Sequence, residues 1–412
     1  MRFGIKQRLQ EMAWVTGGLA TSRILTLLAS VVGARILEVE EFGRFTLFVT
    51  VALLMADMGR PIDNAYVRET SGKHNVDAES YYHYSVRLKL ALVAVALLAW
   101  IPVWAYSGSV YASIPGIIGA AMVVGSFWMI TYSLLSDFQR RQQFMRVGLL
   151  NPLTGLTLLL AVAVVAAGGE PGLGAVVICT LVLSLAVAVF NLALIFKRRA
   201  ARLYGDERKR FLKLVWVFFS SGAVLQLAGR LDTLLVAAMT NMRELAYYGA
   251  AARTAGPVGM LGAGAGMLLL PVARQAYESS RGLHDYVRRS LLYNMAQLAV
   301  LALLFAFSDQ IVLWLFGEGY GASAVILKWL LLSRMLSALV VPYRVLLQAS
   351  QRPGRLFSLS LIRMFSGAAG ILALVPVMGA SGAAVGLSVG EFVTLCSAAA
   401  FVHRGWRHDR EF

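Results

Sequence analysis

The chain has 412 residues, of which 58% are hydrophobic and only 15% are charged, and its formal net charge is +16. Soluble domains contain about 25% charged residues, so this balance, together with a mean hydropathy of +0.68, excludes an ordinary soluble protein. A spanning helix needs about 20 apolar residues, which leaves room for about a dozen such helices and no sizeable soluble domain. We therefore expect an all-α polytopic membrane protein.

The positive charge is concentrated in alternate connections between the apolar runs. By the positive-inside rule, connections rich in Lys and Arg lie on the cytoplasmic side, so we expect both termini in the cytoplasm and the chain in the cytoplasmic membrane. The excess charge then records topology and contact with anionic lipids, and predicts no nucleic-acid partner. These connections contain Arg2, Lys6 and Arg8; Arg68, Lys73, Arg87 and Lys89; Arg140, Arg141 and Arg146; the run from Lys197 to Lys213; Arg274, Arg281, Arg288 and Arg289; Arg352 and Arg355; and Arg404, Arg407 and Arg410.

The basic N-terminus followed by an apolar run looks like a signal peptide. The run from Ala13 to Ala34 is long enough to span a membrane, however, so we interpret it as the first membrane helix. Cys179 and Cys396 both lie within apolar runs, which favours neither a disulfide nor a cysteine metal site. The sequence also shows no phosphate-binding glycine loop and no His/Cys cluster, so we expect no enzyme, no cofactor and no metal.

Apolar segments of spanning length follow one another along the whole chain. In the first half we predict helices at 13–34, 43–67, 87–105, 114–136, 148–167 and 173–196. After the basic connection 197–213, we predict helices at 214–239, 246–270, 290–307, 322–348, 356–377 and 382–402. The prediction is therefore about 12 transmembrane helices in two six-helix bundles, residues 1–200 and residues 201–412.

The second half repeats the first at an offset of about 203 residues. The run ARILEVEEFGRF from Ala34 to Phe45 aligns with AAMTNMRELAYY from Ala237 to Tyr248, and the turn GEPG at 169–172 aligns with GASG at 379–382. Because each half has an even number of helices, both enter from the same side and form a parallel repeat around an axis along the membrane normal. This arrangement predicts a two-bundle transporter with a central cavity.

Several segments together resemble the bacterial polysaccharide flippases of O-antigen and exopolysaccharide synthesis. They are ARILEVEEFGRF after the first helix, RLDTLLVAAM and LAYYGAAA in the seventh and eighth, WLFGEGYGAS at 314–323, and VPVMGASGAAVG at 375–386. That family belongs to the multidrug/oligosaccharidyl-lipid/polysaccharide exporter superfamily, with the multidrug and toxic compound extrusion transporters and the lipid II flippases. The resemblance implies alternating access and export of an undecaprenyl-diphosphate-linked oligosaccharide, with polysaccharide biosynthesis enzymes as partners.

Charged residues inside the apolar helices are the candidates for a substrate site. A charge at mid-bilayer costs about 2.5–3.5 kcal/mol on insertion scales, so such residues face a cavity or a partner. Arg23 lies in a polar stripe with Thr26 and Ser30. Arginine suits a diphosphate because its fork forms bidentate bonds and stays charged. The residues predicted to contact substrate are Arg23, Arg60, Gln226, Arg230, Arg253 and Arg334.

Ion pairing is the alternative role for Arg60 and Arg230. Arg60 lies three residues from both Asp57 and Asp63, a spacing that allows pairing within one helix. Arg230 and Asp232 are two residues apart and point to different faces, which favours a ligand contact for Arg230.

Arg23 and Arg253 have no acidic residue within their own predicted helices, which favours a cavity role for both. Arg334 has Glu391 as an alternative partner, because both lie near mid-membrane. Asp57, Asp232 and Glu391 are therefore predicted as coupling or structural charges.

The nearest rival function is a drug exporter of the same superfamily. Such exporters use an acidic residue in the first helix for ion coupling, and none occurs between Ala13 and Ala34. A polysaccharide polymerase or ligase is a rival from another class. Those enzymes have a large external loop, whereas the longest external connection predicted here lies near Ser308–Gly321.

Overall fold

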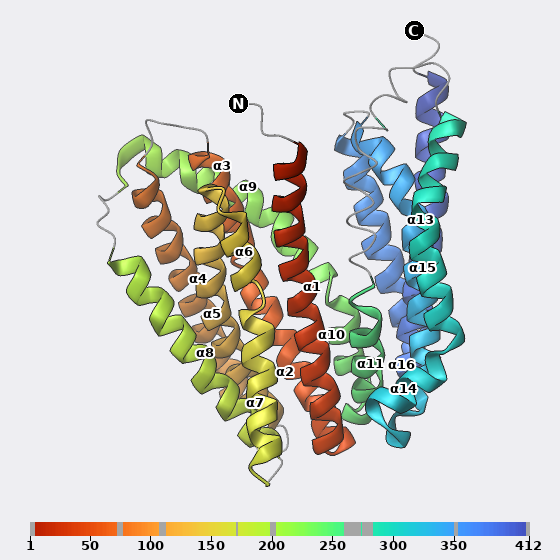
Figure 1. Cartoon of the computed structure of the whole chain (residues 1–412), viewed down its shortest axis with the longest axis horizontal. Helices are drawn as coiled ribbons and strands as arrows, with labels where there is room; N and C mark the ends of the chain where they lie inside the picture. The colour runs from red at the N-terminus through yellow and green to blue at the C-terminus, as the bar shows by residue number, and fades with distance from the viewer. Residues whose placement is uncertain are drawn as a thin grey trace. The chain divides into compact units, whose positions relative to one another are not determined.

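Two compact units make up the chain, Met1–Arg230 and Leu231–Phe412. Among the residues that the structure describes, every regular element is a helix, which confirms the predicted all-α class (Figure 1). The bundle boundary predicted after residue 200 stays a prediction, and the first compact unit also includes α9. The computed structural model describes residues 5–71, 77–106, 113–169, 172–197, 203–258, 273, 283–349 and 353–408.

The helices of each unit follow in chain order. Unit 1 contains α1 (Ile5–Ile36), α2 (Val39–Asp57), α3 (Arg60–Thr70), α4 (Ala78–Tyr106), α5 (Ser113–Arg140), α6 (Phe144–Leu150), α7 (Leu153–Ala167), α8 (Leu173–Phe196) and α9 (Gly205–Ala228). Unit 2 contains α10 (Leu231–Met239), α11 (Met242–Ala255), α13 (Leu283–Ala306), α14 (Ser308–Phe316), a 3-10 turn (Glu318–Tyr320), α15 (Ala322–Ala349) and α16 (Pro353–His408). The predicted helix 173–196 is confirmed at both ends. The last part of the helix predicted at 246–270 lies outside the described residues.

Three predicted spans, at 43–67, 148–167 and 214–239, are each broken into two helices. The helix predicted at 43–67 breaks between α2 and α3, where Pro61 occupies the first turn of α3. Proline lacks the N–H that an interior turn needs but is tolerated at a helix start. At the same break a Cβ on Gly59 would lie 2.4 Å from Cγ of Met129, so glycine permits this close contact with α5. The break places Asp57 and Arg60 at adjoining helix ends.

Membrane-spanning length is common among the helices. Nine helices of the described chain are long and apolar enough to cross a membrane, or ten if the pair α13 and α14, bent by 70°, forms one span. The 49-residue apolar part of α16 counts as one of these. A straight helix of that length would measure about 74 Å, more than twice the roughly 30 Å hydrocarbon core.

The long helix α16 is in fact a hairpin of two spans. Gly379 has non-helical angles with φ 59°, which marks the turn. The two arms on either side of this turn pack closely. A Cβ on Gly370 of the first arm would lie 2.8 Å from the carbonyl oxygen of Gly386 on the second. Small residues allow such close helix approach in membranes. This confirms the separate helices predicted at 356–377 and 382–402.

The internal repeat is visible in the helix ends. Helix α1 ends at Ile36 and α10 ends at Met239, while α2 begins at Val39 and α11 begins at Met242, so both pairs are separated by the predicted offset. The aligned turn glycines Gly169 and Gly379 both have positive φ angles. Glycine adopts this left-handed region without the penalty that a Cβ imposes.

The second span forms the centre of unit 1. Of the most apolar stretch in Val39–Thr70, 72% of the residues are buried, against 17% in Ala78–Pro102 on α4. The many exposed apolar side chains on α4 and α8 are those of a lipid-facing surface, because soluble monomers rarely expose large contiguous apolar patches. The protein is therefore a multi-pass membrane protein, and Asp57 on α2 and Asp63 on α3 are buried within its first unit.

One predicted connection is a helix. The segment 308–321, expected to be the longest external connection, contains α14 and the 3-10 turn. Ser308 is buried at the start of α14, and Tyr320 is buried in the turn against Phe316. The segment was read as a loop because its glycines and its short apolar run give no span-length signal.

Candidate functional site

Two arginines share one aspartate at the break between α2 and α3. Arg60 donates from Nε to Oδ1 of Asp57 at 2.6 Å, and Arg230 donates from Nη2 to Oδ2 of Asp57 at 2.8 Å. All three residues belong to unit 1, because Arg230 is its last residue and follows the end of α9. We call Asp57, Arg60 and Arg230 the arginine cluster. The structure shows the pairing of Arg60 with Asp57, which the sequence had left as an alternative to a ligand contact, whereas the pairing of Arg230 with Asp57 was not foreseen.

The arginine cluster is exposed unevenly. The side chains of Arg60 and Arg230 are 43% and 25% exposed, whereas that of Asp57 is only 10% exposed. The guanidinium of Arg60 lies over the ring of Tyr132 on α5, 4.6 Å from the ring centroid, which holds it in place by a cation–π contact. One carboxylate between two guanidinium groups leaves a net positive charge. With five N–H donors on each arginine, the cluster can bind an anion on its exposed side.

A second ion pair lies further along α3 and is fully buried. Nζ of Lys89 on α4 donates to both carboxylate oxygens of Asp63 at 2.7 Å, and to Oγ of Ser133 at 2.7 Å. Ser136 donates from Oγ to Oδ1 of Asp63 at 3.0 Å. The side chains of Lys89 and Asp63 are 1% and 9% exposed. We call Asp63 and Lys89 the lysine pair; its hydrogen bonds join α3, α4 and α5.

The position of Lys89 differs from the one predicted from the sequence. Lys89, at the start of the helix predicted at 87–105, was counted with the basic connection before that helix, but α4 begins at Ala78, so Lys89 lies well inside it. The missed signal was the spacing of Tyr82, Ser85 and Lys89, which puts them on one helix face. All three are buried, while Arg87 between them is exposed.

Asp232 and Arg334 both lie near Tyr248 in unit 2. Tyr248 on α11 donates from its hydroxyl to Oδ2 of Asp232 on α10 at 2.7 Å. Arg334 on α15 is close enough to Tyr248 to act on it electrostatically. Asp232 and Arg230 thus have different partners, as their spacing predicted. Tyr248 was missed, because nothing in its own apolar helix marks it as polar.

Glu391 pairs with an arginine other than the predicted one. Nη2 of Arg363, on the first arm of α16, lies 2.5 Å from Oε1 of Glu391 on the second arm. The predicted pairing of Glu391 with Arg334 is therefore wrong. Arg344 on α15 is near both residues of this pair. The hairpin at Gly379 brings Arg363 and Glu391 side by side.

The remaining predicted site residues lie on three different helices. Arg23 is exposed on α1, Gln226 is half-buried one turn before Arg230 on α9, and Arg253 is half-buried in the last turn of α11. Arg23 and Arg253 each have interaction partners within the protein. Their contact with substrate stays a prediction. Within the described part of the chain, no group of three or more His, Cys, Asp or Glu residues is placed to hold a metal ion.

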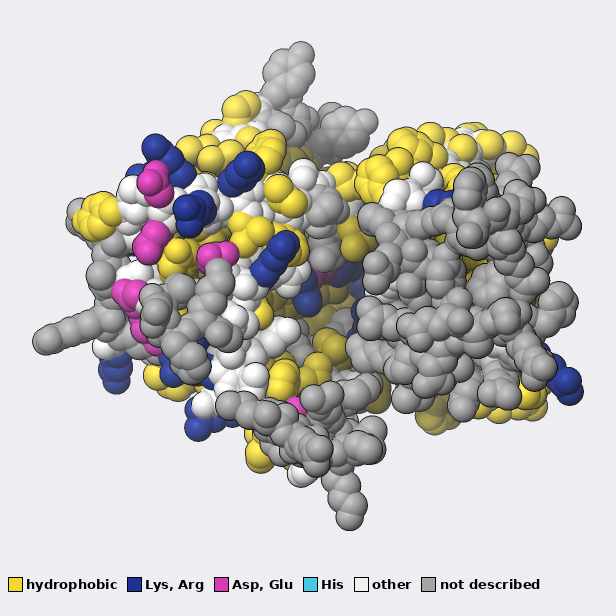
Figure 2. All heavy atoms as spheres, turned by 90° about the horizontal axis from the view of Figure 1, so that it is seen from above, with side chains coloured by type: hydrophobic (Ala, Val, Ile, Leu, Met, Phe, Trp, Pro, Cys, Tyr) yellow, Lys and Arg dark blue, Asp and Glu magenta, His cyan; other side chains and the backbone are white. Residues whose placement is uncertain are grey.

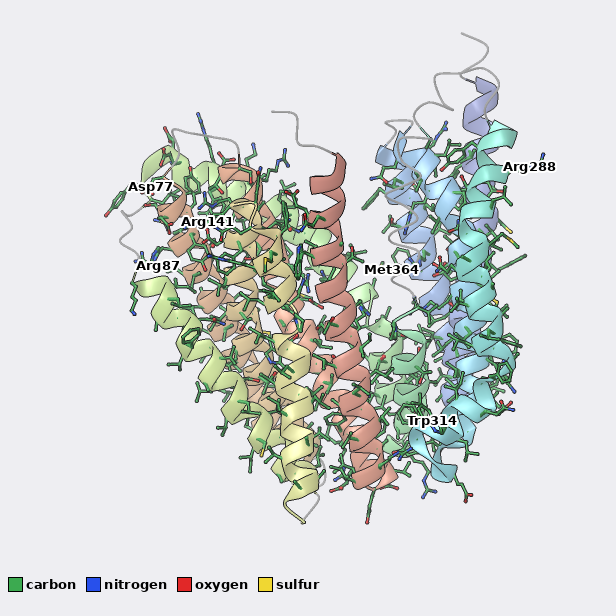
Figure 3. All side chains as sticks on the ribbon, viewed as in Figure 1. Asp77, Arg87, Arg141, Arg288, Trp314 and Met364 are labelled. Atoms are coloured by element: carbon green, nitrogen blue, oxygen red, sulfur yellow. The ribbon has the colours of Figure 1, made fainter. Side chains whose placement is uncertain are left out.

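Charged side chains also gather at one end of unit 1. Figure 3 places Asp77 and Arg141 toward the end where α1 begins, with Arg87 further along α4. Figure 2, which views the molecule from above that end, shows Lys, Arg, Asp and Glu side chains over unit 1. Arg141 bridges two acidic residues there, with Nη2 2.5 Å from Oε1 of Glu79 and Nε 3.0 Å from Oδ2 of Asp137. This end is polar, in contrast to the apolar flanks.

Comparisons with known proteins agree with this architecture. A family profile described as "Polysaccharide biosynthesis protein" matches residues 32–325. No sequence among the curated proteins matches the chain significantly.

Solved transporter structures share the fold at low sequence identity. The chain is similar to the lipid II flippase MurJ in an inward closed conformation, with 17% identity, a TM-score of 0.75, and coverage of 94% of this chain and 87% of that one. It is similar to an inward-facing multidrug resistance MATE family transporter of the MOP superfamily, with 15% identity, a TM-score of 0.71, and coverage of 94% and 96%. The Vibrio cholerae MATE transporter VcmN in its bent form has 13% identity, a TM-score of 0.57, and coverage of 98% and 97%.

Proposed function

Because the chain belongs to the polysaccharide biosynthesis protein family, we propose that it is a flippase that moves an undecaprenyl-diphosphate-linked oligosaccharide from the cytoplasmic to the outer leaflet of the bacterial inner membrane. Transport proceeds by alternating access of the two bundles. The protein acts as a transporter and catalyses no covalent reaction. Enzymes of polysaccharide biosynthesis supply its substrate, and anionic lipids contact its basic connections.

The arginine cluster carries this proposal. A diphosphate that crosses the hydrocarbon core needs compensating cations within the core, where unpaired charge is costly. Arg60 and Arg230 have partly exposed side chains and supply two guanidinium groups that share one carboxylate. Arg23 and Gln226 of unit 1, and Arg253 and Arg334 of unit 2, are proposed as further substrate contacts. A cationic lining suits an anionic lipid headgroup better than the cationic substrates of a drug exporter.

The rival hypothesis, a drug exporter, has less support. Between Ala13 and Ala34 the sequence of α1 has no acidic residue that could couple an ion. Asp57, the acidic residue of the arginine cluster, already bonds to two arginines. A polymerase or ligase needs an extended catalytic loop outside the membrane, whereas the segment 308–321 is largely helical.

Translocation of a labelled lipid-linked oligosaccharide tests the function directly. The purified protein is reconstituted into vesicles, and the substrate that reaches the opposite leaflet is quantified with an impermeant glycan-modifying reagent. We expect transfer that requires both the diphosphate and the polyprenyl chain. Equal transfer in protein-free vesicles, or transport of a cationic dye in place of the lipid, would reject the proposal.

Cysteine labelling tests the proposed orientation. Cysteines at Glu40 and Gly317, near helix turns, should react with an impermeant reagent added outside intact cells. A cysteine at Tyr204, in the basic connection, should react only after the membrane is opened. External labelling of Tyr204→Cys would contradict the cytoplasmic placement of the basic connections.

A further inference from the structure

Asp57 occupies the position that an anionic ligand of the arginine cluster would take. Its two carboxylate oxygens accept one hydrogen bond each, from Nε of Arg60 at 2.6 Å and from Nη2 of Arg230 at 2.8 Å. A phosphate group accepts charge-assisted bonds from guanidinium donors at about 2.7–2.9 Å. A phosphate and the Asp57 carboxylate are therefore alternative acceptors for the same donors.

The exposure of the cluster allows this exchange. The side chains of both arginines are partly exposed, whereas Asp57 is nearly buried, so a ligand reaches the arginines before it reaches the carboxylate. An ionised carboxylate left beside a bound diphosphate would be repelled by its charge. Like charges at close range disfavour the ionised form of a carboxyl group. The displaced Asp57 would thus be driven to bind a proton.

We propose that Asp57 is a built-in competitor for the substrate diphosphate, which the diphosphate displaces from Arg60 and Arg230 and which takes up one proton when it is displaced. The proposal rests on the flippase function proposed above and adds a regulatory role for this carboxylate. The exchange breaks two arginine–carboxylate hydrogen bonds, forms arginine–phosphate bonds in their place, and converts the carboxylate and one solvent proton to a carboxylic acid.

The surroundings of Asp57 favour the proton as its new partner. The charged and titratable groups facing it are Arg60 from α3, Tyr132 from α5 and Arg230 after α9. Helix α8, which also packs on α2, has no charged residue between Leu173 and Phe196. The next cation along α3 and α4, Lys89, is already bonded to both oxygens of Asp63.

Binding of inorganic pyrophosphate to the purified full-length protein tests the competition. By calorimetry at neutral pH, Asp57→Asn should bind pyrophosphate about tenfold more tightly than the wild type, the effect of removing one charge-assisted competitor. The difference should shrink as the pH falls, because the wild-type carboxylate then becomes protonated. Protonation of the ligand affects both proteins equally, so the ratio of their affinities reports on Asp57.

Two variants control for unrelated effects. Asp309→Asn removes an exposed carboxylate of unit 2 and should leave both the affinity and its pH dependence at wild-type values. Arg230→Gln should weaken pyrophosphate binding, because it removes a proposed ligand. Equal or weaker binding by Asp57→Asn, a constant ratio across pH, or no pyrophosphate binding by either protein would overturn the competitor role.

The wild type alone provides a second measurement if Asp57→Asn does not purify as folded protein. Sulfate keeps its charge through this pH range, so its affinity for the wild type should rise as the pH falls if Asp57 competes with it. A flat or opposite profile overturns the proposal. Either failure is separable from failure of the flippase function, because vesicle translocation by the wild type would then continue. Loss of wild-type translocation would instead reject the function itself.

Discussion

The arginine cluster and the lysine pair lie on the same broken span but have different surroundings. In the lysine pair both charges are buried, and the Lys89 ammonium is bonded to the Asp63 carboxylate and to Ser133. In the arginine cluster the two arginine side chains are partly exposed, and their guanidinium groups share one carboxylate. The charged groups of the lysine pair thus form their hydrogen bonds within the protein. The arginine cluster keeps N–H donors that can bind a ligand.

This difference separates a structural role from a binding role. Breaking a buried ion pair by removing one partner costs about 3–5 kcal/mol, because the remaining charge stays desolvated. A partly exposed arginine can be rehydrated when its partner is lost, so its removal affects stability less. The exposure of the charges and the completeness of their hydrogen bonding, rather than the residue types, thus predict which substitutions impair folding and which impair transport.

The largest effect is expected for Lys89→Met. Removing the ammonium leaves Asp63 charged in the core, so we expect a loss of about 3–5 kcal/mol in unfolding free energy and a sharp fall in membrane levels. Thermal unfolding of the purified protein measures the change.

The double variant Lys89→Met with Asp63→Asn checks the cause. It removes both charges, so it should recover much of the stability that Lys89→Met loses. A double variant as unstable as the single one would show that packing of the lysine stem, and not the uncompensated carboxylate, dominates at this position.

The next largest effect is expected on transport, from Arg230. Arg230→Gln removes charge-assisted bonds worth about 1.5–3 kcal/mol, which corresponds to a loss of roughly 10- to 150-fold in oligosaccharide translocation at normal protein levels. Arg230→Lys keeps the charge but not the bidentate fork, so its translocation rate should lie between those of the wild type and Arg230→Gln.

Partner removal tests whether Arg230 serves only to neutralise Asp57. If it does, Arg230→Gln combined with Asp57→Asn should regain transport, because neither charge is then left alone. We expect the double variant to remain inactive, since the substrate still lacks its ligand. Recovery would assign Arg230 to the structure and leave Arg23 and Arg253 as the proposed phosphate ligands.

Much of the fold could be predicted from the sequence because apolar length and the internal repeat are local signals. The repeat places the ends of α1 and α10 correctly, and the turn at Gly379 was located by alignment with Gly169. The breaks within spans were missed, since hydropathy continues through them. At the α2–α3 break, Pro61 was the available signal.

The candidate site was less predictable, because pairing between helices depends on tertiary packing. The pairing of Arg60 with Asp57 follows from their spacing in one segment. The partners of Arg230, Glu391 and Lys89 come from other helices or from the far arm of a hairpin. A single sequence gives the depth of these charges in the membrane but not which helix faces which.

A smaller effect is expected where a carboxylate is half-buried. Oε2 of Glu244 accepts a hydrogen bond from the backbone N–H of Ala380 at 2.9 Å, just after the Gly379 turn. Glu244→Ala should cost about 1.5 kcal/mol, the lower end of the range for a hydrogen bond to a charged group, because the carboxylate is only half-buried. Thermal unfolding measures this cost. A loss as large as that of Lys89→Met would show that burial of the charge does not rank these sites.

The smallest effect is expected for the exposed ion pair of unit 2. Nζ of Lys328 lies 2.7 Å from Oδ2 of Asp309, but the two side chains are 35% and 60% exposed. Exposed pairs contribute about 0–1 kcal/mol, because water solvates each charge when the other is removed. Lys328→Met should therefore change the unfolding free energy by less than about 1 kcal/mol and leave translocation at the wild-type rate. Lys328→Arg, which keeps the charge, is the matched control for the length of the side chain. If Lys328→Met destabilised the protein as strongly as Lys89→Met, while Lys328→Arg did not, ion-pair strength would be independent of exposure here. The distinction between the lysine pair and the arginine cluster would then have to rest on their hydrogen-bond partners alone.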